Sequence, residues 1–258
     1  MIFTLLGTGT SQGIPVIGCN CPTCTSTDPR DRRLRCSALV QSSTTSVVID
    51  VGPDFRQQML THQVREIDAV VITHEHNDHV IGLDDLRPLI FRSGRPMTIY
   101  AEQRVLAEIK NRFAYAFETH QYPGAPEFRL IEVVPGQLLQ IGDIHIRAVR
   151  VMHGRLPILG YVIEDQIGYL TDTNDIPAAS YEHLAELDVL ILDMLRHKPH
   201  HSHNHFDRAV TMAKQLQAKQ TFFTHMSHML GPTSVWEKDL PELMWSSYDG
   251  QQFELSEC

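Results

Sequence analysis

Three histidines and an aspartate lie within six positions, directly after a run of β-branched apolar residues. They are His74, His76, Asp78 and His79 in the stretch VVITHEHNDH. Side chains two apart on an extended chain point the same way, so His74 and His76 can reach one ion, and a turn can carry Asp78 and His79 to a neighbouring position. A site for two cations about 3.5–4 Å apart needs imidazoles and carboxylates divided in this way. The spacing therefore favours a two-metal centre over a surface loop that happens to be rich in histidine.

The composition is that of a soluble globular protein with a sizeable core. The chain has 258 residues, of which 42% are hydrophobic and 21% charged, and its formal charge is −9. That charge argues against binding to a nucleic-acid backbone or an anionic membrane, although metals could still attract a small anionic substrate. No stretch approaches the roughly 18 apolar residues of a membrane span. We expect a cytoplasmic protein that acts on a small molecule, as a monomer or as a homodimer.

Short β-like runs and helix-like segments share the chain. Strands are expected at 2–6, 46–51, 68–73, 97–101, 188–194 and 221–225, with further strands and hairpin turns between 128 and 169. Helices are expected at 102–116, 177–187 and 206–217. Strands that first meander and then alternate with helices, once in each half, predict two packed sheets with helices outside. We therefore expect one α/β domain over residues 1–258, an αββα sandwich.

The histidine motif resembles the signature of the metallo-β-lactamase-fold hydrolases. Four further landmarks of that family occur in order. They are Asp50 in VVIDVG, His153 in AVRVMHG, Asp172 in GYLTDTND and His225 in FFTHMSH. Each would be unremarkable alone, since a polar residue at a strand end is commonly a surface or capping residue. Their order along residues 50–225 supports the resemblance.

The resemblance implies a division of these residues between two cations. His74, His76 and His153 would hold one metal ion, and Asp78, His79 and His225 the other, with Asp172 bridging both. Asp50 is expected to orient a ligand rather than to bind metal. Imidazole and carboxylate donors suit manganese or zinc, and a water molecule shared by the two ions would become the hydroxide nucleophile.

Three cysteines near the amino terminus suggest a second, smaller metal site. Cys19, Cys21 and Cys24 form C-x-C-x-x-C, which suits a metal better than a disulfide framework, and a structural zinc site needs a fourth ligand. Here the sequence resembles the branch that contains the phosphoribosyl 1,2-cyclic phosphate phosphodiesterases. The resemblance implies His228, three residues after His225, as the fourth zinc ligand.

The same branch implies a proton donor and a reaction. His205, in HHSHNHFD, matches a family histidine credited with protonating the leaving group, whereas its neighbours His197, His200, His201 and His203 are expected to form a solvated loop. The opening GTGTSQG also resembles the branch, although a glycine-rich turn without a ligand is a fair rival. The resemblance therefore implies a phosphodiesterase that opens a small cyclic phosphodiester.

Three alternatives stay open at this stage. The same two-metal centre serves acyl hydrolases such as lactonases and thioesterases. A tRNA 3′-end nuclease is disfavoured by the acidic charge and by the lack of a long basic insertion. A non-catalytic protein linked to quinone-cofactor biosynthesis would be expected to lose part of the ligand set, and none is missing here. One departure is Asn77, where many relatives have glycine; asparagine tolerates the backbone conformations of a tight turn.

Overall fold

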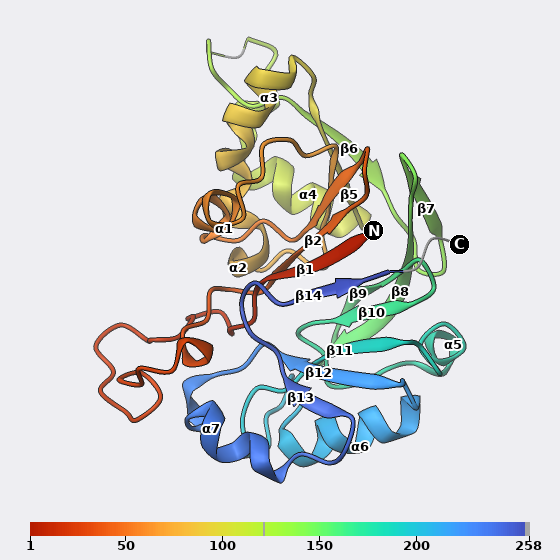
Figure 1. Ribbon diagram of the computed structural model, residues 1–258. Helices are drawn as coiled ribbons and strands as arrows, with labels where there is room; N and C mark the ends of the chain where they lie inside the picture. The colour runs from red at the N-terminus through yellow and green to blue at the C-terminus, as the bar shows by residue number, and fades with distance from the viewer. Residues whose placement is uncertain (121, 256–258) are drawn as a thin grey trace.

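Two seven-stranded sheets form the centre of the computed structural model, which describes residues 1–120 and 122–255. The first sheet has the order β14-β1-β2-β3-β4-β5-β6 and the second β13-β12-β11-β10-β9-β8-β7. Figure 1 shows helices on the outer side of each sheet. The predicted αββα sandwich is therefore confirmed.

The first sheet is built from the first half of the chain and one strand from its end. Its strands are β1 (Ile2–Gly7), β2 (Ser37–Gln41), β3 (Ser46–Ile49), β4 (Ala69–Val71), β5 (Met97–Ala101), β6 (Phe128–Glu132) and β14 (Gln252–Glu254). Pairing is antiparallel from β14 to β3 and parallel from β3 to β6. The outer helices are α1 (Phe55–Thr61), α2 (Asn77–Val80), α3 (Arg87–Ser93) and α4 (Gln103–Arg112).

The second sheet repeats this change from antiparallel to parallel pairing. Its strands are β7 (Leu138–Ile141), β8 (Ile144–His153), β9 (Leu156–Ile163), β10 (Ile167–Leu170), β11 (Val189–Asp193), β12 (Gln220–Thr224) and β13 (Met244–Ser246). The strands from β7 to β10 are antiparallel and those from β10 to β13 parallel. Its helices are α5 (Ala178–Tyr181), α6 (Phe206–Leu216) and α7 (Thr233–Trp236).

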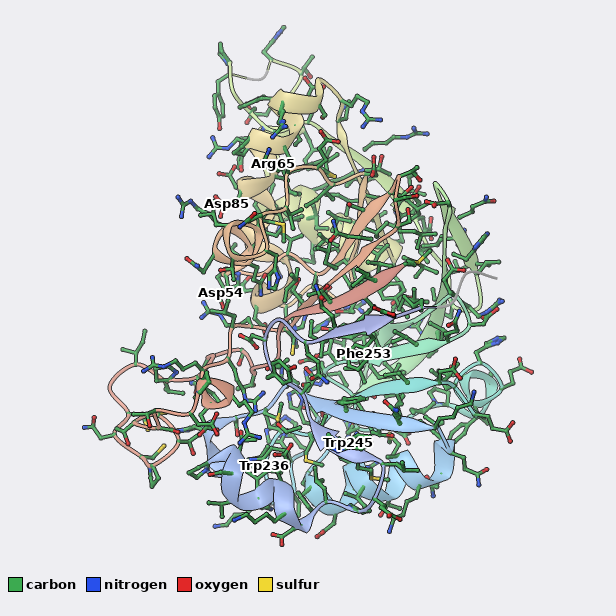
Figure 2. The ribbon with its side chains drawn as sticks, viewed as in Figure 1. Asp54, Arg65, Asp85, Trp236, Trp245 and Phe253 are labelled. Atoms are coloured by element: carbon green, nitrogen blue, oxygen red, sulfur yellow. The ribbon has the colours of Figure 1, made fainter. Side chains whose placement is uncertain are left out.

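The core between the sheets is apolar and continuous. Phe3 of the first sheet and Tyr169 of the second are both fully buried, with ring centroids 5.9 Å apart, and Phe253, labelled in Figure 2, packs against Phe3. Separate apolar clusters lie between each sheet and its outer helices. Burying both faces of each sheet explains why the strand sequences are mostly apolar without strict alternation.

Several expected elements differ in extent. The strand expected at 68–73 ends at Val71, so His74 lies in the loop after it, because the chain turns there toward α2. The helix expected at 177–187 is helical only over α5, and the one expected at 102–116 ends at Arg112 before a short 3-10 turn. Among the residues that the structure describes, no helix is long and apolar enough to cross a membrane.

Candidate metal centre

The polar residues singled out in the sequence lie at the carboxyl ends of central strands. Asp50 follows β3, Asp172 comes two residues after β10, and His225 follows β12. All three have a left-handed backbone, with φ of 63°, 53° and 58°. Residues other than glycine seldom adopt this conformation, and it costs of order 1–3 kcal/mol where it occurs. The fold accepts that strain where these side chains converge.

His74, His76 and His153 form the first group of ligand-type side chains. One ring nitrogen from each lies within 4.8 Å of the other two, and His74 Nε2 is 2.9 Å from His76 Nδ1. Two nitrogens bound to one cation at 2.0–2.1 Å lie about 3 Å apart. His153 donates its Nδ1 hydrogen to the Ser202 carbonyl at 2.9 Å, which leaves Nε2 for the site. The geometry matches one three-histidine cation site.

Asp78, His79, Asp172 and His225 form the second group, again within 4.8 Å. The two oxygens of Asp172 point to different histidines: Oδ2 lies 3.1 Å from His79 Nε2, and Oδ1 lies 3.1 Å from His225 Nε2. Asp78 Oδ2 is 3.3 Å from His79 Nε2. Asp78 and His79 lie on α2, a single helical turn that begins directly after His76.

Two buried carboxylates orient the histidines from behind. His79 donates its Nδ1 hydrogen to Asp50 Oδ2 at 2.7 Å, as the sequence predicts for Asp50. The hydroxyl of Thr73 also donates to Asp50 Oδ2, and its oxygen lies 3.0 Å from His74 Nδ1. Asp193 lies behind His225, with 3.2 Å between its Oδ1 and His225 Nδ1, close enough for an ion pair but without the geometry of a hydrogen bond. Such partners fix the tautomer of a metal-binding imidazole.

A glycine allows the α2 turn to approach the end of β3. A Cβ on Gly52 would lie 2.0 Å from the carbonyl oxygen of Asp78. The Val51 amide donates to the His79 carbonyl at 2.7 Å across the same contact. Glycine in VVIDVG is therefore required for the close packing that places Asp78 and His79.

The buried nitrogens test whether a cation fits here. His79 Nε2 and His225 Nε2 are buried and lack a hydrogen bond of good geometry, although carboxylate oxygens lie about 3 Å away. Buried polar atoms are nearly always satisfied, and these point at the same carboxylate. Asp172 also has an oxygen within 4.8 Å of a ring nitrogen of His153, so it lies between the two groups. Seven nitrogen and oxygen donors arranged in this way suit two divalent cations.

The protonation states of the ligands differ between the two groups. Burial lowers the pKa of His74, His76 and His153, which keeps them neutral and able to bind a cation. Burial also acts to lower the pKa of His79, but Asp78, Asp172 and Asp50 outweigh it and hold that pKa well above its ordinary value. A cation at His79 Nε2 must therefore displace a proton.

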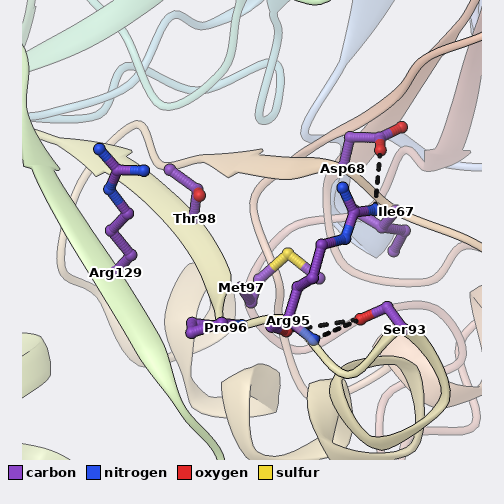
Figure 3. A pocket seen from close by; sticks show the side chains of 8 residues that line it. All are labelled: Ile67, Asp68, Ser93, Arg95, Pro96, Met97, Thr98 and Arg129. Atoms are coloured by element: carbon purple, nitrogen blue, oxygen red, sulfur yellow. Dashed lines mark hydrogen bonds and ion pairs between the residues drawn. The ribbon is translucent and has the colours of Figure 1, made fainter.

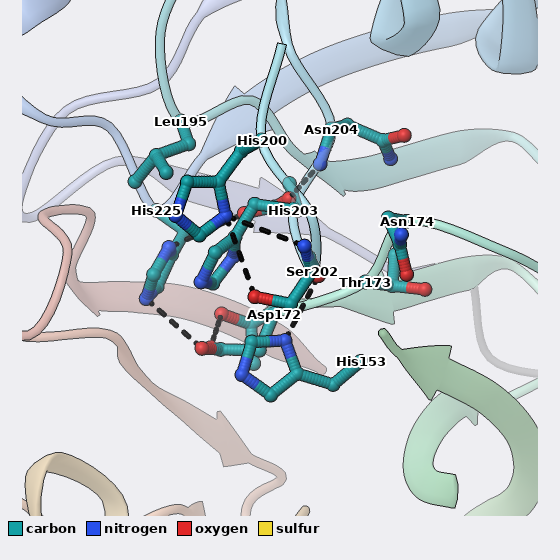
Figure 4. Close-up of polar contacts among 12 residues, drawn as sticks. His153, Asp172, Thr173, Asn174, Leu195, His200, Ser202, His203, Asn204 and His225 are labelled. Carbon is teal, nitrogen blue, oxygen red and sulfur yellow. Dashed lines mark hydrogen bonds and ion pairs between the residues drawn. The ribbon is translucent and has the colours of Figure 1, made fainter. Parts of the chain in front are cut away.

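The structure brings His203, rather than His205, to these groups. The His203 ring stacks on His225 with centroids 4.7 Å apart and lies 4.5 Å from the ring of His153 (Figure 4). Its Nδ1 donates to Asp193 Oδ1 at 3.3 Å. Burial acts to lower the pKa of His203, but Asp193 outweighs it and raises the pKa to about 8. The expectation of a solvated loop is wrong for His203, which is only 8% exposed.

His205 lies at the start of α6, where its side chain makes no capping hydrogen bond. Among the described residues, no hydrogen bond, ion pair or ring contact joins His205 to the seven side chains of the two groups above, which we call the metal-type residues. The sequence alone could not tell which of His203 and His205 would face the ligands, because both lie in one polar run. The turn into α6 decides that the ring of His203 faces Asp193.

Cys19, Cys21, Cys24 and His228 come together in a separate site. Their Sγ atoms lie 3.3, 3.4 and 3.5 Å from His228 Nδ1, and all four donors lie within 4.8 Å of one another. Burial raises the pKa of the Cys21 thiol, but hydrogen bonds from the Cys24 amide and His228 outweigh it and lower the pKa to about 6. This closed set of thiols and one imidazole fits a structural zinc ion.

The cysteine site is tied to the metal-type residues through the backbone. The Thr10 amide donates to the Met226 carbonyl, and the Met226 amide donates to the Thr8 carbonyl, both at 3.0 Å. These bonds join the GTGTSQG segment to the residue after His225. In this segment, Gly7 and Gly9 pack closely against the backbone of residues 33–35.

An open hollow of about 540 Å³ adjoins the first group of histidines. It is lined by His76, His153, Gly154, Arg155, Leu156, His201 and Ser202. A second hollow, of about 360 Å³, is shown in Figure 3 and lies at the amino ends of β4 and β5, opposite the ends that carry the metal-type residues. Its lining contains no histidine and no cysteine.

Comparisons with known proteins agree with this geometry. Residues 45–226 match the model of a family described as the beta-lactamase superfamily domain. A crystal structure titled as a new diphosphatase from the PhnP family is 41% identical, covers 100% of this chain and 98% of its own, and has a TM-score of 0.92. Zinc-bound PqqB from Methylobacterium extorquens has a TM-score of 0.81 at 16% identity, with 99% of this chain and 100% of its own covered, and shows the fold alone.

A curated relative from Porphyromonas gingivalis, named octanoyltransferase, is 41% identical over 98% of this chain. The chain spans 51% of that relative, about half its length.

Replacing the bridging carboxylate tests the two-cation arrangement. Asp172→Asn keeps the size of the side chain but removes its charge, so we expect bound divalent metal, measured by inductively coupled plasma mass spectrometry after dialysis, to fall by at least one ion per chain. Asp175→Asn, at an exposed position nearby, should retain the full content. Equal metal content in both variants would contradict a shared bridge.

Cys24→Ser tests the zinc site. The variant should lose one zinc ion per chain and unfold at a lower temperature, because the closed ligand set contributes directly to folding. The matched control is Thr27→Ala, an exposed position on the same loop. Metal analysis and a thermal melt provide the two readouts, and unchanged zinc in the cysteine variant would refute the assignment.

Proposed function

Because the chain belongs to the beta-lactamase superfamily and, within it, to the PhnP family, we propose that it is a dimetal hydrolase that cleaves a small phosphodiester, most simply a cyclic one. The observation that carries the proposal is the position of Asp172, which lies among Asp78, His79 and His225 of the second group and also has an oxygen within 4.8 Å of a ring nitrogen of His153 from the first group. Two divalent cations held there would lower the pKa of a water molecule toward neutrality and neutralise charge on phosphoryl oxygens.

The residues around the site divide the remaining work. His74, His76 and His153 would hold one cation, and Asp78, His79 and His225 the other. Asp50 keeps His79 in the tautomer that presents Nε2, and Asp193 lies 3.2 Å from His225 Nδ1 on the side away from Asp172. The hollow of about 540 Å³ is within the usual range for a small-molecule pocket, which supports a small substrate over tRNA.

A proton donor for the departing oxygen would complete the reaction. An alkoxide is a poor leaving group, and an imidazole with a pKa near neutrality is suited to protonate it. The family resemblance implies His205 for this role, and the ring of His203 lies nearer the ligands, 4.5 Å from His153 and 4.7 Å from His225 between ring centroids.

A second candidate is an acyl hydrolase acting on a thioester or lactone. The name of the P. gingivalis relative favours it. However, half of that relative lies outside the match, and its named activity can belong to that half.

A hydrolysis panel separates the candidates. Protein loaded with manganese or zinc would be given a ribose cyclic phosphate, bis-p-nitrophenyl phosphate, a lactone, a thioester and precursor tRNA. We expect the highest kcat/KM on the cyclic phosphate, and the Asp172→Asn variant serves as the background control. Preference for the lactone or thioester would replace the proposal with the acyl hydrolase.

Two histidine variants locate the proton donor. His205→Ala should reduce kcat on a substrate with an alkoxide leaving group by about 10²-fold or more, with little change on a p-nitrophenyl ester, whose leaving group needs no proton. Steady-state kinetics on both substrates provides the readout. If His205→Ala left kcat on the alkoxide substrate unchanged, and His203→Ala lowered it selectively, the assignment to His205 would be wrong.

A further inference from the structure

The glutamate between the two histidines of the H-x-H motif contacts an outer helix rather than the metal-type residues. His74 and His76 face each other in the first group, whereas Glu75 forms an ion pair with Arg104 of α4. Successive side chains on an extended chain point to opposite sides, which explains the difference. The loop that carries the ligands is therefore attached to α4 on its other side.

A second arginine of α4 holds the backbone of the same loop. Arg112 Nη1 donates to the carbonyl of Glu75 and, at 3.0 Å, to Oδ1 of Asn77. Arg112 lies two helical turns after Arg104, so both extend from the same side of α4. Asn77 is the position where many relatives have glycine, and its side chain supplies an acceptor that glycine lacks.

The helix that carries these arginines is anchored in the core. Val105, Leu106 and Ile109 of α4 are buried, and they belong to the same apolar cluster as Ile72 and Val80. Ile72 precedes the ligand loop and Val80 ends α2 behind it. Both ends of the loop and the helix that contacts it are therefore packed on one surface.

Arg112 contacts the part of the loop between its two hydrogen-bonded ends. At one end the Thr73 amide donates to Asp50 Oδ1 at 2.8 Å. At the other end the His79 amide donates to the His76 carbonyl at 3.0 Å. The residues that Arg112 holds, Glu75 and Asn77, alternate along the chain with His76 of the first group and Asp78 of the second. A shift of the loop at Arg112 would therefore displace a ligand of each cation.

We propose that Arg112 is a positioning residue for both cations, acting through the backbone of Glu75 and the side chain of Asn77. This inference rests on the two-cation centre of the proposed function and is independent of the substrate. A guanidinium suits the role because its fixed fork can bond several acceptors at once. Arg104 is the less specific of the two arginines, because it also donates to the Pro157 carbonyl of β9 at 2.8 Å.

A manganese titration measures the effect without turnover. Protein with zinc at its cysteine site and no other metal would be titrated with manganese, and free manganese would be followed by electron paramagnetic resonance. Arg112→Ala should raise the Kd for manganese by about 10–100-fold, as is usual for residues that orient metal ligands. Zinc at the cysteine site, measured by mass spectrometry, should stay at one ion per chain, because Arg112 does not contact that site.

Three further variants define the contact. Lys110→Ala, at an exposed cation on the same helix, should bind manganese as the wild type does. Arg112→Lys should recover part of the loss, because a lysine keeps a donor for the Glu75 carbonyl without the fork. Asn77→Ala should weaken binding on its own but add little to Arg112→Ala, since residues that act through one contact are not additive.

The outcomes separate positioning from general stability. Equal manganese Kd in Arg112→Ala and the wild type would overturn the proposal. Parallel loss of manganese and of cysteine-site zinc, with a lower melting temperature, would also overturn it, because that pattern indicates damage to the whole fold. If Arg112→Ala does not fold, Arg112→Lys decides: a raised Kd with zinc retained supports the proposal, and the wild-type Kd overturns it.

Failure of the proposed function would look different. A wild type that binds no manganese beyond the cysteine site would overturn the two-cation centre and this inference together, whereas equal binding in the wild type and the arginine variants would overturn this inference alone.

Discussion

Asp172 is the buried charge on which the rest of the structure depends. Burial penalises its ionised form, but His225, His79 and His74 outweigh that penalty and hold its pKa well below the ordinary value. A carboxylate kept ionised in the interior needs positive partners, and its two oxygens face two different histidines. The left-handed backbone at Asp172 is the local cost of that position.

The two sheets explain how distant segments reach one carboxylate. In each sheet the strands change from antiparallel to parallel pairing, and the parallel strands end on the same side. Residues that follow β3, β10 and β12 therefore meet there although they lie far apart in sequence. The cysteine site braces this edge, because the segment before it pairs with the backbone next to His225. Metal at the cysteine site should thus be coupled to order around His225.

The sequence predicts the local parts of this arrangement better than the distant ones. His74, His76, Asp78 and His79 lie in one motif, and their grouping follows from spacing. His153, Asp172 and His225 could be placed only through the family resemblance, since nothing local distinguishes them from capping residues. The apolar runs predict most central strands, whereas β2, β13 and β14 were missed because β2 follows a polar loop and the others are three residues long.

The most direct test is anomalous X-ray diffraction from crystals grown with manganese or zinc. We expect two anomalous peaks about 3.5–4 Å apart on either side of the Asp172 carboxylate, one against His74, His76 and His153 and the other against Asp78, His79 and His225. A single peak at the cysteine site, with none beside Asp172, would contradict the two-cation centre and the hydrolase chemistry built on it.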